Sequence, residues 1–259
     1  MKKTVVILIV LLGVFSGEIQ AAWDLELMAY SAIDNSLYKI SGSPLQTTNI
    51  GTLQTPVTAD MMALARATDA SAYSIDRAAN ILYSIDLSDA STISSAQIDY
   101  DVIVYNRGLD VSPSGAIYEI FEDNELRIIN PDNGTTTFVC NIDLPWMESL
   151  AFSPNGDLYG GTGAGELYEI NILTGDITLI ADTPIIDIDA LTFAPDGYLY
   201  AADSEAARVS NLYRIDPLTG NTVDLGSTGL YGLNGLLAVP EPATLLLFSL
   251  GAVILRRKR

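Results

Sequence analysis

An internal repeat of 41 to 45 residues constrains the fold of this chain more than any other sequence feature. Its clearest element is Leu-Tyr-x-Ile, or a close variant, starting at Leu37, Leu82, Leu126, Leu167 and Leu212. Consecutive copies are 45, 44, 41 and 45 residues apart. Polar turns such as residues 130–134 and 216–220 follow, with Asn or Asp first and Gly last. Such turns are typical of hairpin loops, so the repeat indicates antiparallel strands.

A second pattern precedes the first within each unit. It reads as a strand ending in Pro-x-Gly, followed by another short strand, at residues 109–118, 150–159 and 191–200. Its leading leucine, with degenerate copies included, recurs as Leu64, Leu109, Leu150, Leu191 and Leu236. Four short strands with this period predict the blade of a β-propeller, and five leucines predict five blades. A solenoid with five turns is the alternative architecture.

The order of the parts predicts how the ring closes. Residues 25–31 read as the second strand of a blade, and the missing first strand returns at residues 235–239. One blade is then shared between the two ends of the domain. An open solenoid has no use for such a return, so the sequence favours an all-β, five-bladed propeller.

Both ends of the chain read as targeting segments. Lys2 and Lys3 precede an apolar stretch at residues 4–15 and small residues up to Ala22. This layout predicts a signal peptide at residues 1–21, with an uncleaved anchor as the alternative. The propeller is then expected at residues 22–239, and a sorting or anchor segment at residues 240–259.

The C-terminal segment has three parts in a fixed order. Pro240, Glu241 and Pro242 form an extended tripeptide, residues 243–255 are an apolar run too short for an ordinary spanning helix, and residues 256–259 are all basic. This arrangement resembles the PEP-CTERM sorting signal of Gram-negative bacteria. The resemblance implies export across the inner membrane, a transient membrane anchor at residues 243–255 and processing by an exosortase-type enzyme. The protein is then expected at the cell surface or outside the cell. An ordinary tail anchor is the alternative.

The repeats resemble those of YVTN and NHL-like bacterial propellers, in which a strand ending in Ser-Pro-Asp-Gly leads into Leu-Tyr. The likeness spans most of residues 25–239, and its copies at residues 109–118, 150–159 and 191–200 carry it. The resemblance implies a fold and leaves function open, because propellers serve many functions.

The amino-acid composition argues against several classes of function and site. A net charge of −19 makes nucleic-acid binding unfavourable. The chain has no histidine, which excludes Ser-His-Asp and Cys-His catalysis and His-ligated zinc or haem. Cys140 is the single cysteine, so no intramolecular disulfide can form.

Candidate site residues come from aligning the repeats. The residue two positions before each leading leucine is Met62, Arg107, Glu148, Asp189 and Asn234. Glu148, Asp189 and Asn234 offer oxygen ligands for a hard cation such as calcium, and Arg107 offers a contact for an anionic ligand. The set resembles the channel sites of calcium-dependent lactonase-type propellers, which have six blades and often a histidine. A water-filled channel mouth without an ion is the alternative.

Function stays open between three classes. The sequence favours a secreted or surface-held binding or matrix-interaction module, with extracellular polysaccharide as an expected partner. The enzyme alternative is a calcium-dependent lactonase, or a glycoside hydrolase that uses Asp187 and Asp189, which share one face of a strand. Trp23 and Trp146 are the only tryptophans available to stack on a sugar. A structural component of the exopolysaccharide layer is the third reading.

Overall fold

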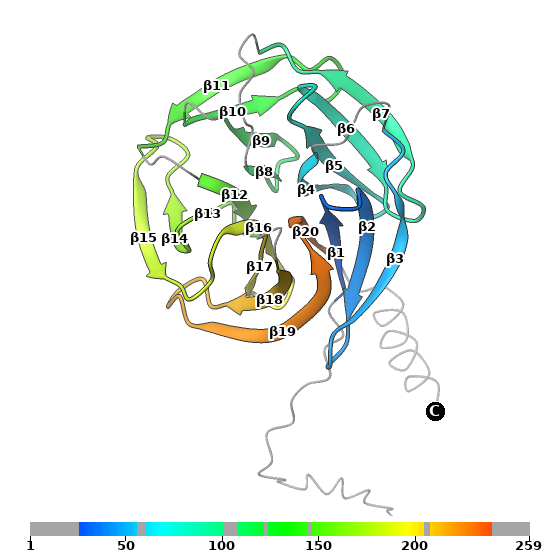
Figure 1. Ribbon diagram of the computed structural model, residues 1–259. Coiled ribbons are helices and arrows are strands. Elements are labelled where there is room, and N and C mark those ends of the chain that lie inside the picture. Colours follow the sequence, from blue (N-terminus) through cyan, green and yellow to red (C-terminus); the bar gives the residue numbers. More distant parts are fainter. Residues whose placement is uncertain are drawn as a thin grey trace, which may run out of the picture.

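The computed structural model describes residues 26–55, 61–100, 108–121, 124–143, 147–204 and 208–239. These residues form twenty strands in five four-stranded antiparallel sheets, arranged as a ring (Figure 1). The predicted all-β, five-bladed propeller is confirmed, and the solenoid is excluded. The expected signal peptide and the sorting tail lie outside the described residues. Within these ranges the chain has no helix of the length and apolar character needed to cross a membrane.

Each blade is one sheet, written here from its innermost strand to its outermost strand. Blade 1 contains β20 (Leu233–Val239), β1 (Glu26–Ser31), β2 (Ser36–Ser41) and β3 (Gln46–Thr52). Blade 2 contains β4 (Met61–Thr68), β5 (Ser71–Asp76), β6 (Ile81–Asp86) and β7 (Thr92–Gln97). Blade 3 contains β8 (Gly108–Val111), β9 (Ile117–Ile120), β10 (Glu125–Ile129) and β11 (Thr136–Asn141). Blade 4 contains β12 (Met147–Phe152), β13 (Leu158–Thr162), β14 (Glu166–Ile170) and β15 (Ile177–Asp182). Blade 5 contains β16 (Ile188–Phe193), β17 (Leu199–Asp203), β18 (Val209–Ile215) and β19 (Thr222–Tyr231).

The ring closes through blade 1, as the sequence predicts. β20 pairs antiparallel with β1, from Glu26 with Val239 to Ser31 with Leu233. The Ser31 hydroxyl also donates a hydrogen bond of 2.8 Å to the Tyr231 carbonyl oxygen. Because this pairing joins residues about 200 positions apart, it fastens the two ends of the domain together.

The centre of the ring is filled by the leading leucines of the repeat. Leu64, Leu109, Leu150, Leu191 and Leu236 are all at most 5% exposed and surround a void of about 10 Å³. That volume holds about one water molecule. The described part of the channel is therefore filled mainly by apolar side chains.

Small residues let the innermost strands approach one another closely. The residue before each leading leucine is Ala63, Gly108, Ser149, Ala190 or Gly235. A Cβ atom on Gly108 would lie 2.8 Å from Leu150 Cγ and 2.9 Å from the Ser149 carbonyl carbon. A Cβ atom on Gly235 would lie 2.8 Å from the Ala63 carbonyl carbon. Neighbouring backbones therefore set the size limit at these positions.

We expect Gly108→Val to destabilise the domain by about 1–3 kcal/mol, because the new side chain would overlap the backbone of β12. For a domain of this size the melting temperature should fall by roughly 2–4 °C per kcal/mol. Ser95→Val, on the exposed outer strand β7, is the control and should change little. Equal melting temperatures for the two variants would contradict this account of the packing.

Candidate metal centre at the channel mouth

A cavity of about 290 Å³ opens at one end of the central channel. Four of the five blades contribute to it, and its lining residues are Ala32, Ile33, Met62, Arg77, Glu148, Asp187, Asp189, Ser204, Gly232 and Asn234. The aligned residues Met62, Glu148, Asp189 and Asn234 thus lie around one space, as the repeat alignment predicts. Arg107, the fifth aligned residue, lies outside the described residues.

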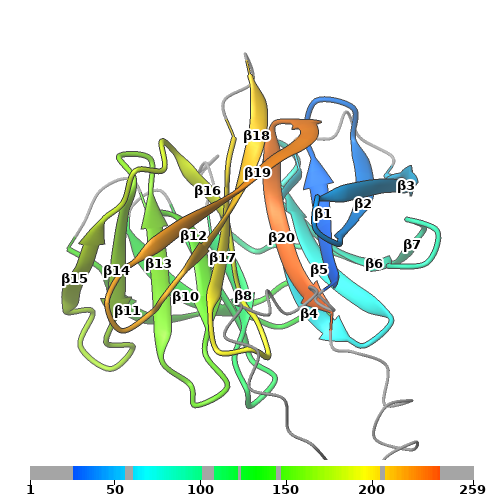
Figure 2. The same cartoon turned by 90° about the horizontal axis from the view of Figure 1, so that it is seen from below.

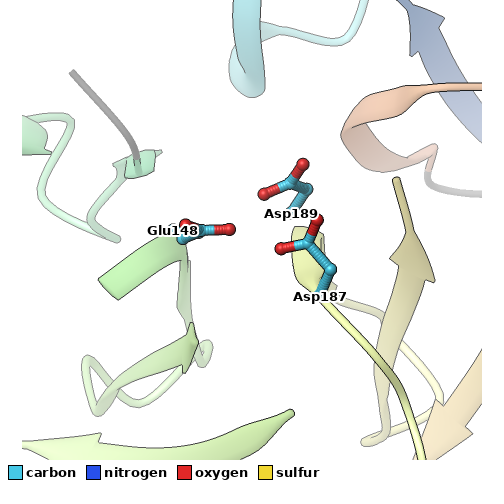
Figure 3. A group of neighbouring side chains, drawn as sticks. All are labelled: Glu148, Asp187 and Asp189. Carbon is cyan, nitrogen blue, oxygen red and sulfur yellow. The ribbon is translucent and has the colours of Figure 1, made fainter. Parts of the chain in front are cut away.

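Three carboxylates converge in this cavity. Glu148, Asp187 and Asp189 each place one oxygen within 4.8 Å of the others, and all three side chains are partly buried. Figure 3 shows Glu148 reaching from blade 4 toward the two aspartates of blade 5. The arrangement brings together two carboxylates that the alignment selected and a third, Asp187, that the strand pattern had paired with Asp189.

Two β-bulges aim the carboxylates into the cavity. The pairing of β12 with β13 shifts register between Met147 and Ser149, which leaves Glu148 out of the ladder. The pairing of β16 with β17 shifts in the same way between Ile188 and Ala190, which leaves Asp189 out. A bulged residue loses its cross-strand partner and turns its side chain to a new direction. The equivalent bulges explain why these two side chains meet across the boundary between blades.

The backbone around the carboxylates is also unusual. Asp187 has a φ of 68°, a left-handed conformation that non-glycine residues seldom adopt. Gly163 lies against the cluster, and a Cβ atom there would be 3.2 Å from Glu148 Oε1 and 3.3 Å from Asp187 Oδ1. The Ser149 hydroxyl donates a 2.6 Å hydrogen bond to the Ile188 carbonyl oxygen and joins the two bulged segments. The cluster therefore lies where a buried hydrogen bond joins blade 4 to blade 5.

The carboxylates perturb one another. Burial, followed by the hydrogen bonds and negative charges of Asp189 and Asp187, raises the pKa of Glu148 well above that of an ordinary glutamate. Desolvation and like charges both disfavour the ionised form of a carboxyl group. The metal-free cluster therefore favours keeping a proton, and Glu148 is the carboxyl group whose pKa is raised.

Asn234 occupies another part of the cavity wall. Its side-chain oxygen accepts a hydrogen bond from the Ser204 hydroxyl, and its amide nitrogen lies 3.1 Å from the Met62 sulfur. The structure thus places Asn234 at the same cavity as Glu148 and Asp189 but gives its oxygen a protein partner. Asp187 is the third oxygen donor of the close cluster, and Asn234 as a cation ligand stays a prediction.

Arg77 and Ser204 also line the cavity, and neither stands out in the aligned repeats. Arg77 follows β5 and Ser204 follows β17, so both reach the cavity from loops on the mouth side of their blades. Ala32, Ile33 and Gly232 line it from the loops beside β1 and β20. Ala32, Arg77 and Ser204 each directly follow the second strand of a blade. Aligning the residues at this position of the repeat is the way to predict this wall of the cavity from the sequence.

Comparisons with known proteins identify the tail and the fold. The model of the PEP-CTERM protein-sorting motif matches residues 238–259, which include Pro240, Glu241 and Pro242. No match was found among curated proteins. A chain in the crystal structure of a nidogen/laminin complex is 14% identical, with a TM-score of 0.54, over 82% of this chain and 84% of that chain. Virginiamycin B lyase from Staphylococcus aureus is 17% identical, with a TM-score of 0.48, over 78% of this chain and 69% of that chain.

At 14% identity the chain in the nidogen/laminin complex shows a shared fold and nothing about activity. The matched tail follows the ring directly, because its first two residues, Ala238 and Val239, are still part of β20. The chain is therefore a five-bladed β-propeller with a C-terminal PEP-CTERM protein-sorting motif, and this motif indicates an exported protein.

Proposed function

We propose that this chain is an exported binding module whose channel mouth takes a divalent cation, with calcium as the expected ion. The observation that carries the proposal is the convergence of Glu148, Asp187 and Asp189 within 4.8 Å at one cavity. Calcium prefers oxygen ligands, favours carboxylates and tolerates irregular geometry. Three carboxylates supply at least three of its ligands, and water or a bound molecule would complete the shell.

Electrostatics support a cation at this position. Without a cation, three acidic groups share a half-buried space. Burial and the two neighbouring aspartates raise the pKa of Glu148, because it is unfavourable to ionise all three groups together. A dication would offset this repulsion and allow all three groups to ionise. This balance of charge supports the proposed cation at the site.

The rest of the cavity suits an anionic ligand. Arg77 lines the same space as the carboxylates, so a bound cation and a guanidinium would face a ligand together. Carboxylate groups of an extracellular polysaccharide match this chemistry, because both positive groups bind such oxygens. The propeller would then act in matrix interaction, after sorting by an exosortase-type enzyme that acts on the PEP-CTERM tail.

Calcium should raise the melting temperature of the protein by several degrees relative to chelator. A ligand at about 100 times its Kd adds about 2.7 kcal/mol to the stability of the folded state. Glu148→Gln and Asp189→Asn should each reduce this shift sharply, because each removes one carboxylate ligand. Asp132→Asn, which removes one negative charge from an exposed turn, should keep it. An unchanged melting temperature in calcium, or a shift retained by both site variants, would refute the cation site.

One observation favours the enzyme alternative. A glutamate whose pKa is raised, next to two aspartates, is also the arrangement of a general acid beside a carboxylate. However, none of the described residues that line the cavity is aromatic, so the wall offers no platform for a sugar ring. This absence disfavours turnover of arabinans, and a lactone panel tests the other enzyme alternative. Activity that disappears in Glu148→Gln while the fold is kept would favour a hydrolase instead.

A further inference from the structure

The two ends of the described chain leave the ring on the face opposite the acidic cavity. Asn234, near the start of β20, lines the cavity, and Val239 ends that strand. Val239 pairs with Glu26 at the beginning of β1, and β1 leads back to Ile33 at the cavity. Figure 2 shows β20 and β1 side by side, running in opposite directions across the thickness of the ring. We call the face that carries Glu26 and Val239 the exit face.

The tail leaves little distance between the exit face and its apolar segment. Only residues 240–242 separate Val239 from the apolar run at residues 243–255. A fully extended chain advances about 3.5 Å per residue, so Ala243 lies within about 14 Å of Val239. If the apolar run enters a bilayer, the exit face is held at the membrane surface.

The exit face also carries the two most exposed leucines of the described chain. Leu173 and Leu218 are each 87% exposed and occupy the same position in the β14–β15 and β18–β19 turns of neighbouring blades. Their backbone N–H groups are fixed by hydrogen bonds to Asn171 Oδ1 (2.9 Å) and Asp216 Oδ1 (2.8 Å). The equivalent position in blade 3 is Asp132, in the turn between β10 and β11.

Strand pairing places both leucine turns on the exit face. The β18–β19 turn follows Ile215, which pairs with Leu199; Leu199 in turn pairs with Phe193, at the end of β16 away from Asp189. The β14–β15 turn follows Ile170, which is linked in the same way to Phe152, at the end of β12 away from Glu148. Burying one leucine side chain in an apolar environment is worth about 1.5–3 kcal/mol, so these turns gain stability from lipid but not from water.

We infer that the tail-bearing propeller rests on a lipid membrane through its exit face, with Leu173 and Leu218 in the interface and the acidic cavity facing away. This orientation keeps the cavity open to ligands while the protein is still anchored. It does not depend on whether the cavity binds a cation. The orientation depends on insertion of residues 243–255 into the membrane. The length of the three linking residues then limits the distance between the exit face and the membrane surface.

Site-specific fluorescence quenching tests the orientation in the full chain. In a Cys140→Ser background, Leu173→Cys and Leu218→Cys place a label on the exit face, and Ile33→Cys places one at the cavity rim. All three positions are well exposed, at 87%, 87% and 58%. Each labelled chain is reconstituted into phosphatidylcholine vesicles that carry a nitroxide on the lipid headgroup. We expect strong quenching at positions 173 and 218, and several-fold weaker quenching at position 33.

Three results would overturn the inference. Equal quenching at the two faces would remove the preferred orientation, and stronger quenching at position 33 would reverse it. Flotation of the vesicles without the protein would show that the tail does not tether the ring. Serine at both leucine positions provides a further check, because Leu173→Ser with Leu218→Ser should weaken quenching of a label at Ser43→Cys, in the β2–β3 turn of the same face, without changing the melting temperature.

Discussion

Glu119→Met should raise the melting temperature of the protein by several degrees at pH 8 and by less at pH 5. Glu119 lies in β9, is 1% exposed, and neither of its carboxyl oxygens has a hydrogen-bond partner in the described structure. Burial raises the pKa of this carboxyl group well above its ordinary value. Methionine has a similar length and no polar atoms to desolvate, so it removes an unfavourable group without leaving a cavity.

The pH dependence follows from proton binding. In the unfolded chain Glu119 loses its proton near pH 4.5, whereas in the folded protein it keeps the proton to higher pH. The folded state then binds more protons than the unfolded state, so this residue lowers stability as the pH rises above 4.5 toward the folded pKa. The slope approaches about 1.4 kcal/mol per pH unit for one proton. Glu119→Met should remove this slope.

Glu119→Gln separates the two effects of the substitution. Glutamine does not titrate, so it should also remove the slope, but it keeps buried polar atoms and should gain less stability than methionine. Thermal unfolding of the three proteins between pH 5 and pH 8 measures both effects. If the unfolding free energies of the wild type and Glu119→Met change in parallel with pH over this range, the account of Glu119 as a neutral buried group is wrong.

The repeat makes Glu119 stand out once the blades are aligned. In other blades the residue paired with the leading leucine is Ala29, Gly160 or Ala201, all small. In blade 3 it is Glu119, paired with Leu109. The aligned sequence therefore shows that Glu119 is exceptional at this position. Only the structure shows that its carboxyl group is shielded from solvent.

The fold was predictable because the repeat combines several independent local signals. Hairpin turns such as residues 130–134 fix the strand boundaries, and the spacing of the leading leucines fixes the number of blades. The closing pair of β20 and β1 followed from the order of strands in the incomplete blade. Each of these features depends on short-range chemistry that is repeated around the ring. A degenerate copy of the repeat in one blade can therefore be recognised by comparison with the other copies.

The site was predictable only in part. Alignment of the repeats placed Glu148, Asp189 and Asn234 at one end of the channel, because equivalent positions in a ring lie at equal depth. It did not reveal the bulges that turn Glu148 and Asp189 inward, since a bulge changes the pairing without a distinctive residue. Arg77 and Ser204 come from loops, whose paths are not fixed by the strand pattern.

Calcium affinity at the channel mouth should rise about tenfold per pH unit between pH 6 and pH 8. The raised pKa of Glu148 means that the metal-free protein carries a proton there, and a calcium ligand must be ionised. Binding then releases that proton, and each step up in pH lowers the cost of releasing it. Calorimetry at three pH values gives the affinity, and paired buffers with different ionisation heats count the protons released.

Asp189→Asn supplies the matched test of this coupling. It removes one of the neighbouring carboxylates that hold the Glu148 pKa high, so binding to the variant should be weaker overall but should depend less on pH. Glu148→Gln in turn should stabilise the metal-free protein at pH 8, because Glu148 must take up a proton on folding that the unfolded chain has lost, and glutamine needs none. The same substitution should weaken calcium binding, because it removes a carboxylate ligand. Affinity that does not change with pH in the wild type would show that Glu148 is already ionised, and the cation would then bind without displacing a proton. Because repulsion in the empty site and attraction in the filled site involve the same carboxylates, a real cation centre must show both effects, whereas a solvated acidic mouth without an ion should show only the first.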